Sequence, residues 1–498
     1  MTDPQQPISR RAARDAASAP RGHDGGTGTG GPDGQGTGEG GPPRVRIGLI
    51  AAALAVGFLL LGTGAVFAGM AVGKNSVAAV TPSGTATNTP TRDLPGDVVA
   101  AAVIPTCSIS KLASAAALKK LYGSVINTST GSSLYAKLDG DAQPPASGEK
   151  VLTAAAAIAK LGPNFRITTK VVDGVTPGSI TLVGEGDATL SSGASNVYGG
   201  APTMASLAAK TLAAYNTAHP GVPITQLVLD ASYWDPGDNW DSTVPRTEQT
   251  GGYLSETTAL QVDGDRANPK AQISPRGTDP VMHAGQAFVT ALGLPGISII
   301  TGQQENGAPT LASVQSEPVY VLAKQMLLNS DNTLAEMLAR IVSVKEALGG
   351  SSASLTQAIP TALTKYGLDT ADISVQDGSG ESNGNAITPL FMAKFMGLVS
   401  EGKNGLQYVA AGLPIAGKSG GLLTRFTGAN AGAVGKVHAK PGFIASAYTL
   451  SGYVTAKDGT KEAFAFFAVG SGIGASANSA LDSLATAVYD CGANLTSD

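Results

Sequence analysis

Ser147-Gly148-Glu149-Lys150 opens an alanine-rich stretch that ends at Gly162-Pro163. This composition and its Gly-Pro stop predict a helix over Ser147–Leu161. Residues three apart on a helix lie one turn apart on one face, so Ser147 and Lys150 are expected to be neighbours. A serine hydroxyl is a weak nucleophile until a base takes its proton, and an amine whose pKa is lowered by burial or nearby cations can be that base. The spacing therefore favours a serine–lysine nucleophile pair.

A second interpretation of Ser147 is a helix N-cap. Lys150 does not fit it, because a cation in the first turn opposes the helix dipole and a capping box takes Glu or Gln there. An isolated Ser-x-x-Lys nevertheless occurs by chance in a chain of 498 residues. The interpretation therefore depends on further clusters.

Ser330-Asp331-Asn332 lies between two predicted helices, Glu317–Leu328 and Thr333–Leu348. It would bring a second hydroxyl and an amide into a cleft, where the hydroxyl relays a proton and the amide holds a substrate carbonyl. The same residue types are also common in a turn before a helix. Both interpretations stay open for this cluster alone.

The C-terminal third has the pattern of an antiparallel meander. Three β-like stretches are followed by a helical one, over Gly435–Lys440, Ala447–Val454, Ala463–Val469 and Ser479–Tyr489. The turn signal Lys457-Asp458-Gly459 joins the last two strands. Further predicted elements are helices over Ser110–Leu121 and Thr203–Tyr215 and strands over Ser133–Leu138, Ile167–Val172 and Ser179–Val183.

Lys440-Pro441-Gly442 begins at the last residue of the first predicted strand of this meander. Strand alternation would place His438, Lys440 and Gly442 on one face. A lysine there supplies positive charge for a substrate carboxylate, and a glycine lets a ligand approach the backbone. Alone, Lys-Pro-Gly at a strand end is more often a turn.

The three clusters, in this order, resemble the S-x-x-K, S-D-N and K-T-G signature of penicillin-binding proteins and serine β-lactamases. Flanking residues make the chain similar to the D-alanyl-D-alanine carboxypeptidase/endopeptidase family, the class C low-molecular-mass penicillin-binding proteins. They are Pro145-Ala146-Ser147, Leu161-Gly162-Pro163, Gly184-Glu185-Gly186-Asp187, Ala335-Glu336, Asp377-Gly378-Ser379-Gly380 and Gly452-Tyr453. The resemblance spans roughly residues 105–495.

The resemblance implies an α/β (α+β) fold. A penicillin-recognising, transpeptidase-like domain with an antiparallel sheet flanked by helices would occupy residues 99–165 and 311–498. A mixed inserted domain would occupy residues 166–310. No cofactor is implied; the implied partners are peptidoglycan stem peptides as substrates and β-lactams as covalent inhibitors.

The resemblance also implies residue roles. Ser147 would be acylated by a D-Ala-D-Ala peptide with Lys150 as its base, and the backbone N–H groups of Ser147 and Phe443 would form the oxyanion hole. The remaining implied site residues are Ser330 as proton relay, Asn332 as substrate holder, Lys440 for the terminal carboxylate, and Gly442 and Asp331 lining the substrate site.

Two residues depart from the family pattern. Pro441 stands where the family usually has a threonine whose hydroxyl binds the substrate carboxylate, and Glu381 stands at an ordinarily apolar position. We expect Pro441 to be tolerated on an edge strand and to weaken carboxylate recognition by about 1–3 kcal/mol. Pro441 also keeps open an alternative, a cell-wall-binding scaffold of the same fold with weakened or lost catalysis.

A histidine-based serine hydrolase is a weaker alternative. Gly417-Lys418-Ser419-Gly420-Gly421 fits a G-x-S-x-G elbow, but that motif needs a preceding strand and a later histidine. Only His438 follows, and Leu413-Pro414-Ile415 is a poor central strand. A glycine-rich loop over the cleft is the better interpretation.

The N-terminal region predicts export. Ile47–Gly73 carries no charge and exceeds the roughly 20 residues that span a bilayer. The arginines that precede it indicate a cytoplasmic N-terminus and a catalytic domain on the cell-wall side, with residues 1–46 disordered and 74–98 a linker. A retained single-pass anchor is favoured over a cleaved signal peptide, whose apolar region is shorter.

Charge and cysteine content restrict the remaining possibilities. A net charge of −4 gives no electrostatic case for nucleic acid, and four isolated histidines give no metal-ligand cluster. Both cysteines, Cys107 and Cys491, follow the apolar segment. An exported chain permits one disulfide between them, although two buried thiols remain an alternative.

Overall fold

The computed structural model describes residues 106–371 and 373–496. The predicted tail, membrane span and linker lie outside these residues. Among the residues described, no helix combines the length and apolar character that crossing a bilayer requires.

The described strands form three sheets. Their bounds are β1 Cys107–Ser108, β2 Lys120–Asn127, β3 Ser133–Lys137, β4 Thr168–Asp173, β5 Ser179–Gly184, β6 Gln226–Asp230, β7 Ser298–Thr301, β8 Thr310–Gln315, β9 His438–Ile444, β10 Ala447–Thr455, β11 Lys461–Val469 and β12 Leu495–Thr496.

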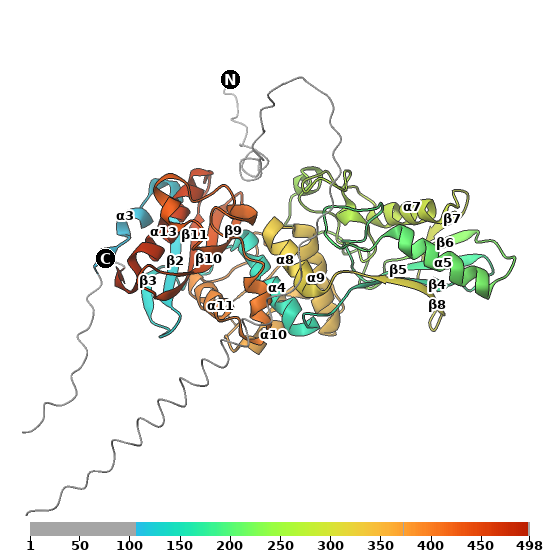
Figure 1. Cartoon of the computed structure of the whole chain (residues 1–498), viewed down its shortest axis with the longest axis horizontal. Helices are drawn as coiled ribbons and strands as arrows, with labels where there is room; N and C mark the ends of the chain where they lie inside the picture. The colour runs from blue at the N-terminus through green and yellow to red at the C-terminus, as the bar shows by residue number, and fades with distance from the viewer. Residues whose placement is uncertain (1–105, 372, 497–498) are drawn as a thin grey trace, which may run out of the picture. The chain divides into compact units, whose positions relative to one another are not determined.

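Helices flank two of the sheets (Figure 1). Their bounds are α3 Ser110–Ala113, α4 Glu149–Leu161, α5 Met204–Ala218, α6 Thr247–Thr250, α7 Pro280–Leu292, α8 Val319–Asn329, α9 Asn332–Lys345, α10 Leu355–Leu363, α11 Pro389–Glu401, α12 Leu406–Ala410 and α13 Ser476–Cys491.

The first large sheet is antiparallel, in the order β3-β2-β11-β10-β9. Side chains alternate between its faces along β11. Phe467 packs in the core that contains Phe395 of α11, whereas Phe464 and Phe466 pack in the core that contains Leu484 of α13. The sheet therefore lies between helices on both faces, and its β9 edge borders the site described below.

The second large sheet is mixed, in the order β7-β6-β5-β4-β8. Strands β5, β6 and β7 run parallel, and β4 pairs antiparallel with β5 and β8. Helices α5 and α7 pack with this sheet, and its strands fall between α4 and α8 in the sequence. This is a mixed α+β architecture, as the sequence predicted; the assigned domain boundaries stay a prediction.

Most predicted elements agree with the structure to within a few residues, but the helix over Ser110–Leu121 is wrong. Only a short α3 and a 3-10 turn over Ala116–Leu118 form there. Lys119 then has φ 55°, and β2 begins at Lys120. Pairing of β2 with β11 buries Leu121 in the sheet, and this tertiary gain outweighs local helical spacing.

The first strand of the meander was placed too early. Strand β9 runs from His438 to Ile444, so Pro441 lies inside it, opposite Leu450 of β10. Because β9 is an edge strand, no strand pairs with its outer side, and a proline without an N–H can be accommodated there.

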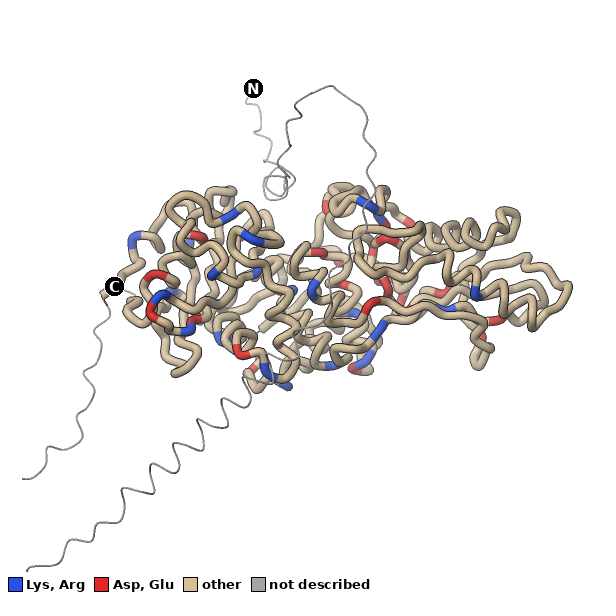
Figure 2. Tube along the Cα trace, viewed as in Figure 1, with Lys and Arg blue, Asp and Glu red and all other residues tan. Residues whose placement is uncertain are grey.

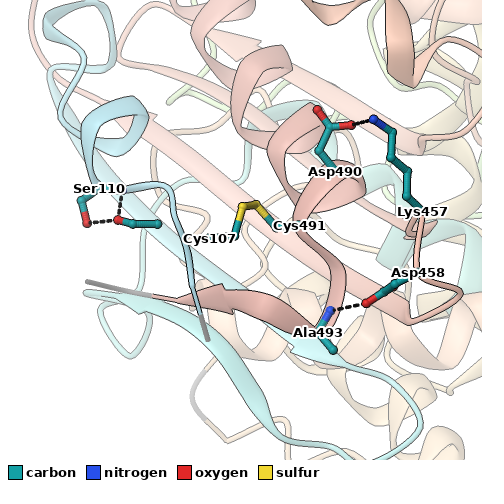
Figure 3. The surroundings of a disulfide bond; sticks show 8 residues. Cys107, Ser110, Lys457, Asp458, Asp490, Cys491 and Ala493 are labelled. Atoms are coloured by element: carbon teal, nitrogen blue, oxygen red, sulfur yellow. Dashed lines mark hydrogen bonds and ion pairs between the residues drawn. A yellow bond between two sulfur atoms is a disulfide. The ribbon is translucent and has the colours of Figure 1, made fainter. Parts of the chain in front are cut away.

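A disulfide joins Cys107 to Cys491 (Figure 3), and so resolves the alternative of two thiols. The bridge links β1 to the end of α13, and β1 pairs in parallel with β12. Nearby, Asp458 accepts the amide hydrogen of Ala493 at 2.8 Å. The two ends of the described chain are therefore tied together.

Lys and Arg are interspersed with Asp and Glu along the described trace (Figure 2). Several basic side chains are paired within the fold, for example Arg425 with Asp482 at 2.7 Å. Some of the described charges are therefore paired inside the fold.

Candidate active site

Ser147 lies in a 3-10 turn, Ala146–Gly148, that leads directly into α4. Ala146 has φ 49°, a left-handed conformation that is rare for alanine and often found at functional sites. Lys150 Nζ donates to Ser147 Oγ at 2.9 Å, and the lysine is fully buried. The predicted serine–lysine contact is therefore present, and Ser147 makes no side-chain N-cap bond to this helix.

A second lysine–serine pair lies beside the first. Ser330 ends α8 with φ 54°, and Asn332 begins α9. Lys440 Nζ, on the edge strand β9, donates to Ser330 Oγ at 2.9 Å and to the Pro441 carbonyl at 3.0 Å. Two residues 110 positions apart in the chain are thus joined by one hydrogen bond.

One cavity of about 460 Å³ exposes most of these groups. The predicted site residues that line it are Ser147, Ser330, Asp331, Lys440, Gly442 and Phe443. Lys150 and Asn332 follow lining residues closely in the sequence, but both are buried and neither lines the cavity. The structure therefore brings the three sequence clusters to one place.

Gly442 is required by the close packing under the cavity. A Cβ at this position would lie 2.2 Å from Thr449 Oγ1 and 2.8 Å from the Pro145 carbonyl oxygen. Thr449 Oγ1 also donates to that carbonyl at 2.8 Å. Strand β9 can approach the turn that carries Ser147 only because residue 442 has no side chain.

Asp331 is held by residues from the segment between β5 and α7. Its Oδ2 accepts from Arg266 Nη2 at 2.8 Å and from the Tyr198 hydroxyl at 3.1 Å, and Arg266 Nη1 donates to the same hydroxyl at 2.8 Å. Its Oδ1 caps α9 by accepting from Leu334 N at 3.0 Å. Both carboxylate oxygens of Asp331 thus accept hydrogen bonds from other groups of the protein.

The charges in this network stabilise one another. Burial alone would raise the pKa of Asp331, but the guanidiniums of Arg266 and Arg276 bring it below its usual value. Burial, followed by the charge of the neighbouring Arg266, lowers the pKa of Arg276 to about 10. Because Asp331 stays ionised, its cap on α9 holds Asn332 at the start of that helix.

A loop containing Asp377-Gly378-Ser379-Gly380 lies under the nucleophile. The Ser379 carbonyl accepts from Lys150 Nζ at 2.5 Å. Gly380 has φ 82°, and a Cβ there would lie 1.9 Å from the Ala146 carbonyl oxygen. Asp377 closes the loop by accepting from Gly380 N at 2.6 Å. This motif, noted in the sequence, therefore positions Lys150 and the Ser147 turn.

Buried carboxylates surround this loop. Burial, followed by the Asp377 charge, raises the pKa of Glu336 to about 7. Burial likewise raises the pKa of Glu149 well above its usual value, against the lowering effect of Lys150. These shifts favour protonation of acids close to the buried lysine.

The elbow alternative does not match the geometry. Ser419 Oγ accepts the amide hydrogen of Ile415 at 3.0 Å, as a turn residue does, and the His438 ring stacks on Tyr453 with centroids 5.2 Å apart. Gly420 and Gly421 line the cavity. This segment is the glycine-rich loop at the cleft.

Sequence reasoning missed Tyr198 and Arg266, and assigned no role to Glu381. The first two lie far from the motifs in sequence and carry no local signal. Glu381 was noted only as a departure from the family, yet its carboxylate contacts Asn332. Within residues 106–371 and 373–496, no group of three or more His, Cys, Asp or Glu is arranged to hold a metal ion.

Known proteins resemble this chain in sequence and in fold. The D-Ala-D-Ala carboxypeptidase 3 (S13) family pattern matches residues 106–273 and 241–488. A carboxypeptidase of Mycobacterium tuberculosis is 32% identical over 404 residues, which cover 78% of this chain and 84% of that protein. Carboxypeptidase DacB of Mycolicibacterium smegmatis is 32% identical over 389 residues, covering 74% and 80%.

Among solved structures, penicillin-binding protein 4 from Haemophilus influenzae shares the fold. It superposes with a TM-score of 0.63 at 21% identity, over 74% of this chain and 96% of that one. The family pattern and the two mycobacterial relatives match most of this chain, which is a serine hydrolase that belongs to the D-Ala-D-Ala carboxypeptidase 3 (S13) family.

Proposed function

We propose that this protein is a serine-type D-Ala-D-Ala carboxypeptidase/endopeptidase that acts on peptidoglycan stem peptides through an acyl-enzyme on Ser147. The observation that carries the proposal is the 2.9 Å contact between Lys150 Nζ and Ser147 Oγ beside the cavity that also exposes Ser330 and Lys440. A nucleophile, a base and a second proton carrier then converge on one space large enough for a short peptide.

In the acylation step, Ser147 Oγ attacks the carbonyl carbon of the scissile amide while its proton passes to Lys150. The backbone N–H groups of Ser147 and Phe443 stabilise the oxyanion. The leaving amine takes a proton by way of Ser330, whose Oγ is 2.9 Å from Lys440 Nζ. Water then attacks the ester, which releases the shortened peptide and restores the Ser147 hydroxyl.

Substrate recognition follows from the remaining groups. Lys440 supplies positive charge for the terminal carboxylate, and the Asn332 amide holds a carbonyl of the peptide. Pro441 cannot provide the hydroxyl that a threonine would contribute beside Lys440. We therefore expect acylation to operate with weakened recognition of a free terminal carboxylate.

The relatives support this assignment. Two of them are named carboxypeptidases, and an Actinomadura D-alanyl-D-alanine carboxypeptidase is 27% identical over 407 residues. The H. influenzae penicillin-binding protein 4 has also been solved with a β-lactam bound. We propose that β-lactams acylate Ser147 as covalent inhibitors, and that the catalytic domain acts on the cell-wall side of a membrane to which Ile47–Gly73 anchors it.

Labelling with a fluorescent penicillin, together with release of D-alanine from a D-Ala-D-Ala peptide, tests the proposal. Wild-type protein should be labelled covalently and should release D-alanine, and Ser147→Ala should do neither. Ser419→Ala is the matched control, because that hydroxyl serves a turn, and it should be labelled like wild type. A wild-type protein that binds peptidoglycan but is neither labelled nor active would instead indicate the scaffold alternative.

A further inference from the structure

Three consecutive residues of the loop under the site contact three different parts of it. The Ser379 carbonyl accepts from Lys150 Nζ, Gly380 packs against the Ala146 carbonyl, and Glu381 accepts from the Asn332 amide nitrogen. The last of these contacts is made by a side chain, so it can be changed without altering the backbone.

Glu381 is only 1% exposed, and its Oε1 accepts from Asn332 Nδ2 at 2.8 Å. In this contact a carboxyl oxygen accepts from the nitrogen end of the amide, and the Asn332 carbonyl oxygen is turned away from Glu381 Oε1. The flipped orientation would place the Asn332 carbonyl oxygen against the carboxylate, acceptor against acceptor. Glu381 therefore selects one of the two orientations of this amide.

In this orientation Asn332 keeps hydrogen-bonding groups that Glu381 does not use. Glu381 uses one of the two N–H donors that the amide nitrogen of Asn332 carries. Asn332 Oδ1 is buried and has no hydrogen-bond partner within the described chain. The amide is thus held at one atom, with a donor and an acceptor that Glu381 does not use.

We propose that Glu381 is a positioning residue that fixes the Asn332 side-chain amide so that its second N–H binds the acyl-amide carbonyl of the substrate. This rests on the proposed function, because it assumes that Asn332 holds that carbonyl during acylation of Ser147. Glu381 acts through Asn332 and does not touch the reacting atoms.

A purely structural role for Glu381 makes a different prediction. If its carboxylate only stabilises the loop, its loss moves Lys150 and the Ser147 turn as well, and every acylating ligand is affected alike. If it orients Asn332, the loss falls on ligands that present an acyl-amide carbonyl. The two cases are separated by two ligands that share a β-lactam nucleus, of which only one carries that carbonyl.

Benzylpenicillin and 6-aminopenicillanic acid are such a pair, since the second has a free amine in place of the phenylacetamide of the first. We would measure the second-order acylation rate of the full-length protein with each, for wild type, Glu381→Gln and Glu381→Leu. Gln keeps an acceptor oxygen of the same reach; Leu has a similar volume and no acceptor. If Glu381→Leu does not fold, as judged by thermal unfolding, Glu381→Ala gives the same comparison.

For Glu381→Leu we expect a loss of about tenfold or more with benzylpenicillin, the size of a hydrogen bond to a charged group. The loss with 6-aminopenicillanic acid should stay within about threefold, and Glu381→Gln should recover most of the benzylpenicillin rate. In an Asn332→Ala background, Glu381→Leu should add nothing further, because the two residues act as one unit.

Equal losses with both ligands, no loss with either, or a full additional loss in the Asn332→Ala background would each overturn the proposal. Its failure is distinct from failure of the proposed function. If only the proposal on Glu381 fails, wild-type protein is still acylated at Ser147 and only the discrimination between the two ligands is missing. If the proposed function fails, wild-type protein is acylated by neither ligand, and this result counts against the proposed function and the Glu381 proposal alike.

Discussion

Replacing Pro441 by threonine should strengthen recognition of a free C-terminal carboxylate. Pro441 lines the cavity beside Lys440 and Gly442, and Lys440 Nζ is already held by Ser330 Oγ at 2.9 Å. The charge that attracts the carboxylate is therefore in place, and only a hydroxyl donor is missing. Threonine has nearly the volume of proline and favours strands, so the β9 edge should accept it.

The magnitude follows from that single donor. A hydrogen bond to a charged group contributes about 1.5–3 kcal/mol, which corresponds to roughly 10- to 150-fold in kcat/KM. Release of D-alanine from a D-Ala-D-Ala peptide measures it. Pro441→Ser should share the gain because it supplies the hydroxyl, whereas Pro441→Ala restores only a backbone N–H and should not.

The ligand provides a second control. A peptide whose terminal carboxylate is converted to an amide should show little gain with Pro441→Thr, because the new bond is then no longer charge-assisted. If Pro441→Thr and Pro441→Ala change turnover equally, the effect comes from the backbone and the reasoning fails. Unchanged turnover in both would mean that residue 441 does not contact the carboxylate.

Three further predictions concern stability. Replacing Cys107 and Cys491 with serine should lower the free energy of unfolding by about 2–5 kcal/mol, because the bridge closes a separation of 384 residues; oxidised and variant proteins with equal Tm would contradict this. Arg266→Met should lower the free energy of unfolding, measured in urea, by about 3–5 kcal/mol, because it leaves the buried Asp331 carboxylate without its ion pair. Adding Asp331→Asn should recover much of this loss. Additive effects in the double variant would contradict a coupled pair. Burial raises the pKa of Glu462 from 4.5 to about 8, so the folded state holds its proton more tightly than the unfolded chain. The stability it contributes is complete below about pH 4.5 and is lost as the pH rises to about 8, so Glu462→Gln should gain stability over wild type across that window, and a constant difference would refute the assignment.

Local patterns in the sequence were enough to predict the contact between Ser147 and Lys150. The spacing of Ser147 and Lys150 predicts their contact, because helix periodicity places residues three apart on one face and depends on nothing distant. The meander of β10 and β11 was likewise readable from alternation and a turn signal. Where local spacing competes with pairing to a distant strand, as in Ser110–Leu121, the sequence-based prediction fails.

The order of the three clusters indicated a shared site, but it could not give the contacts between them. Lys440 reaches Ser330 across 110 residues, and Lys150 reaches the Ser379 carbonyl across 229. Such bonds exist only when sheet and helices have packed against one another. The pairing of Cys107 with Cys491 was left open for the same reason, since sequence gives number and spacing of cysteines but not their distance in space.

What the sequence determined by itself is therefore the chemistry: a serine with a lysine one turn away, a second hydroxyl with an amide, and a lysine on a strand. What only the tertiary structure decided is the support for that chemistry, in which Arg266 and Tyr198 hold Asp331, and Glu381 holds Asn332. The physical reason is that a buried charge or amide must find its partner among whatever residues the fold brings near, and those residues need no common spacing in the chain.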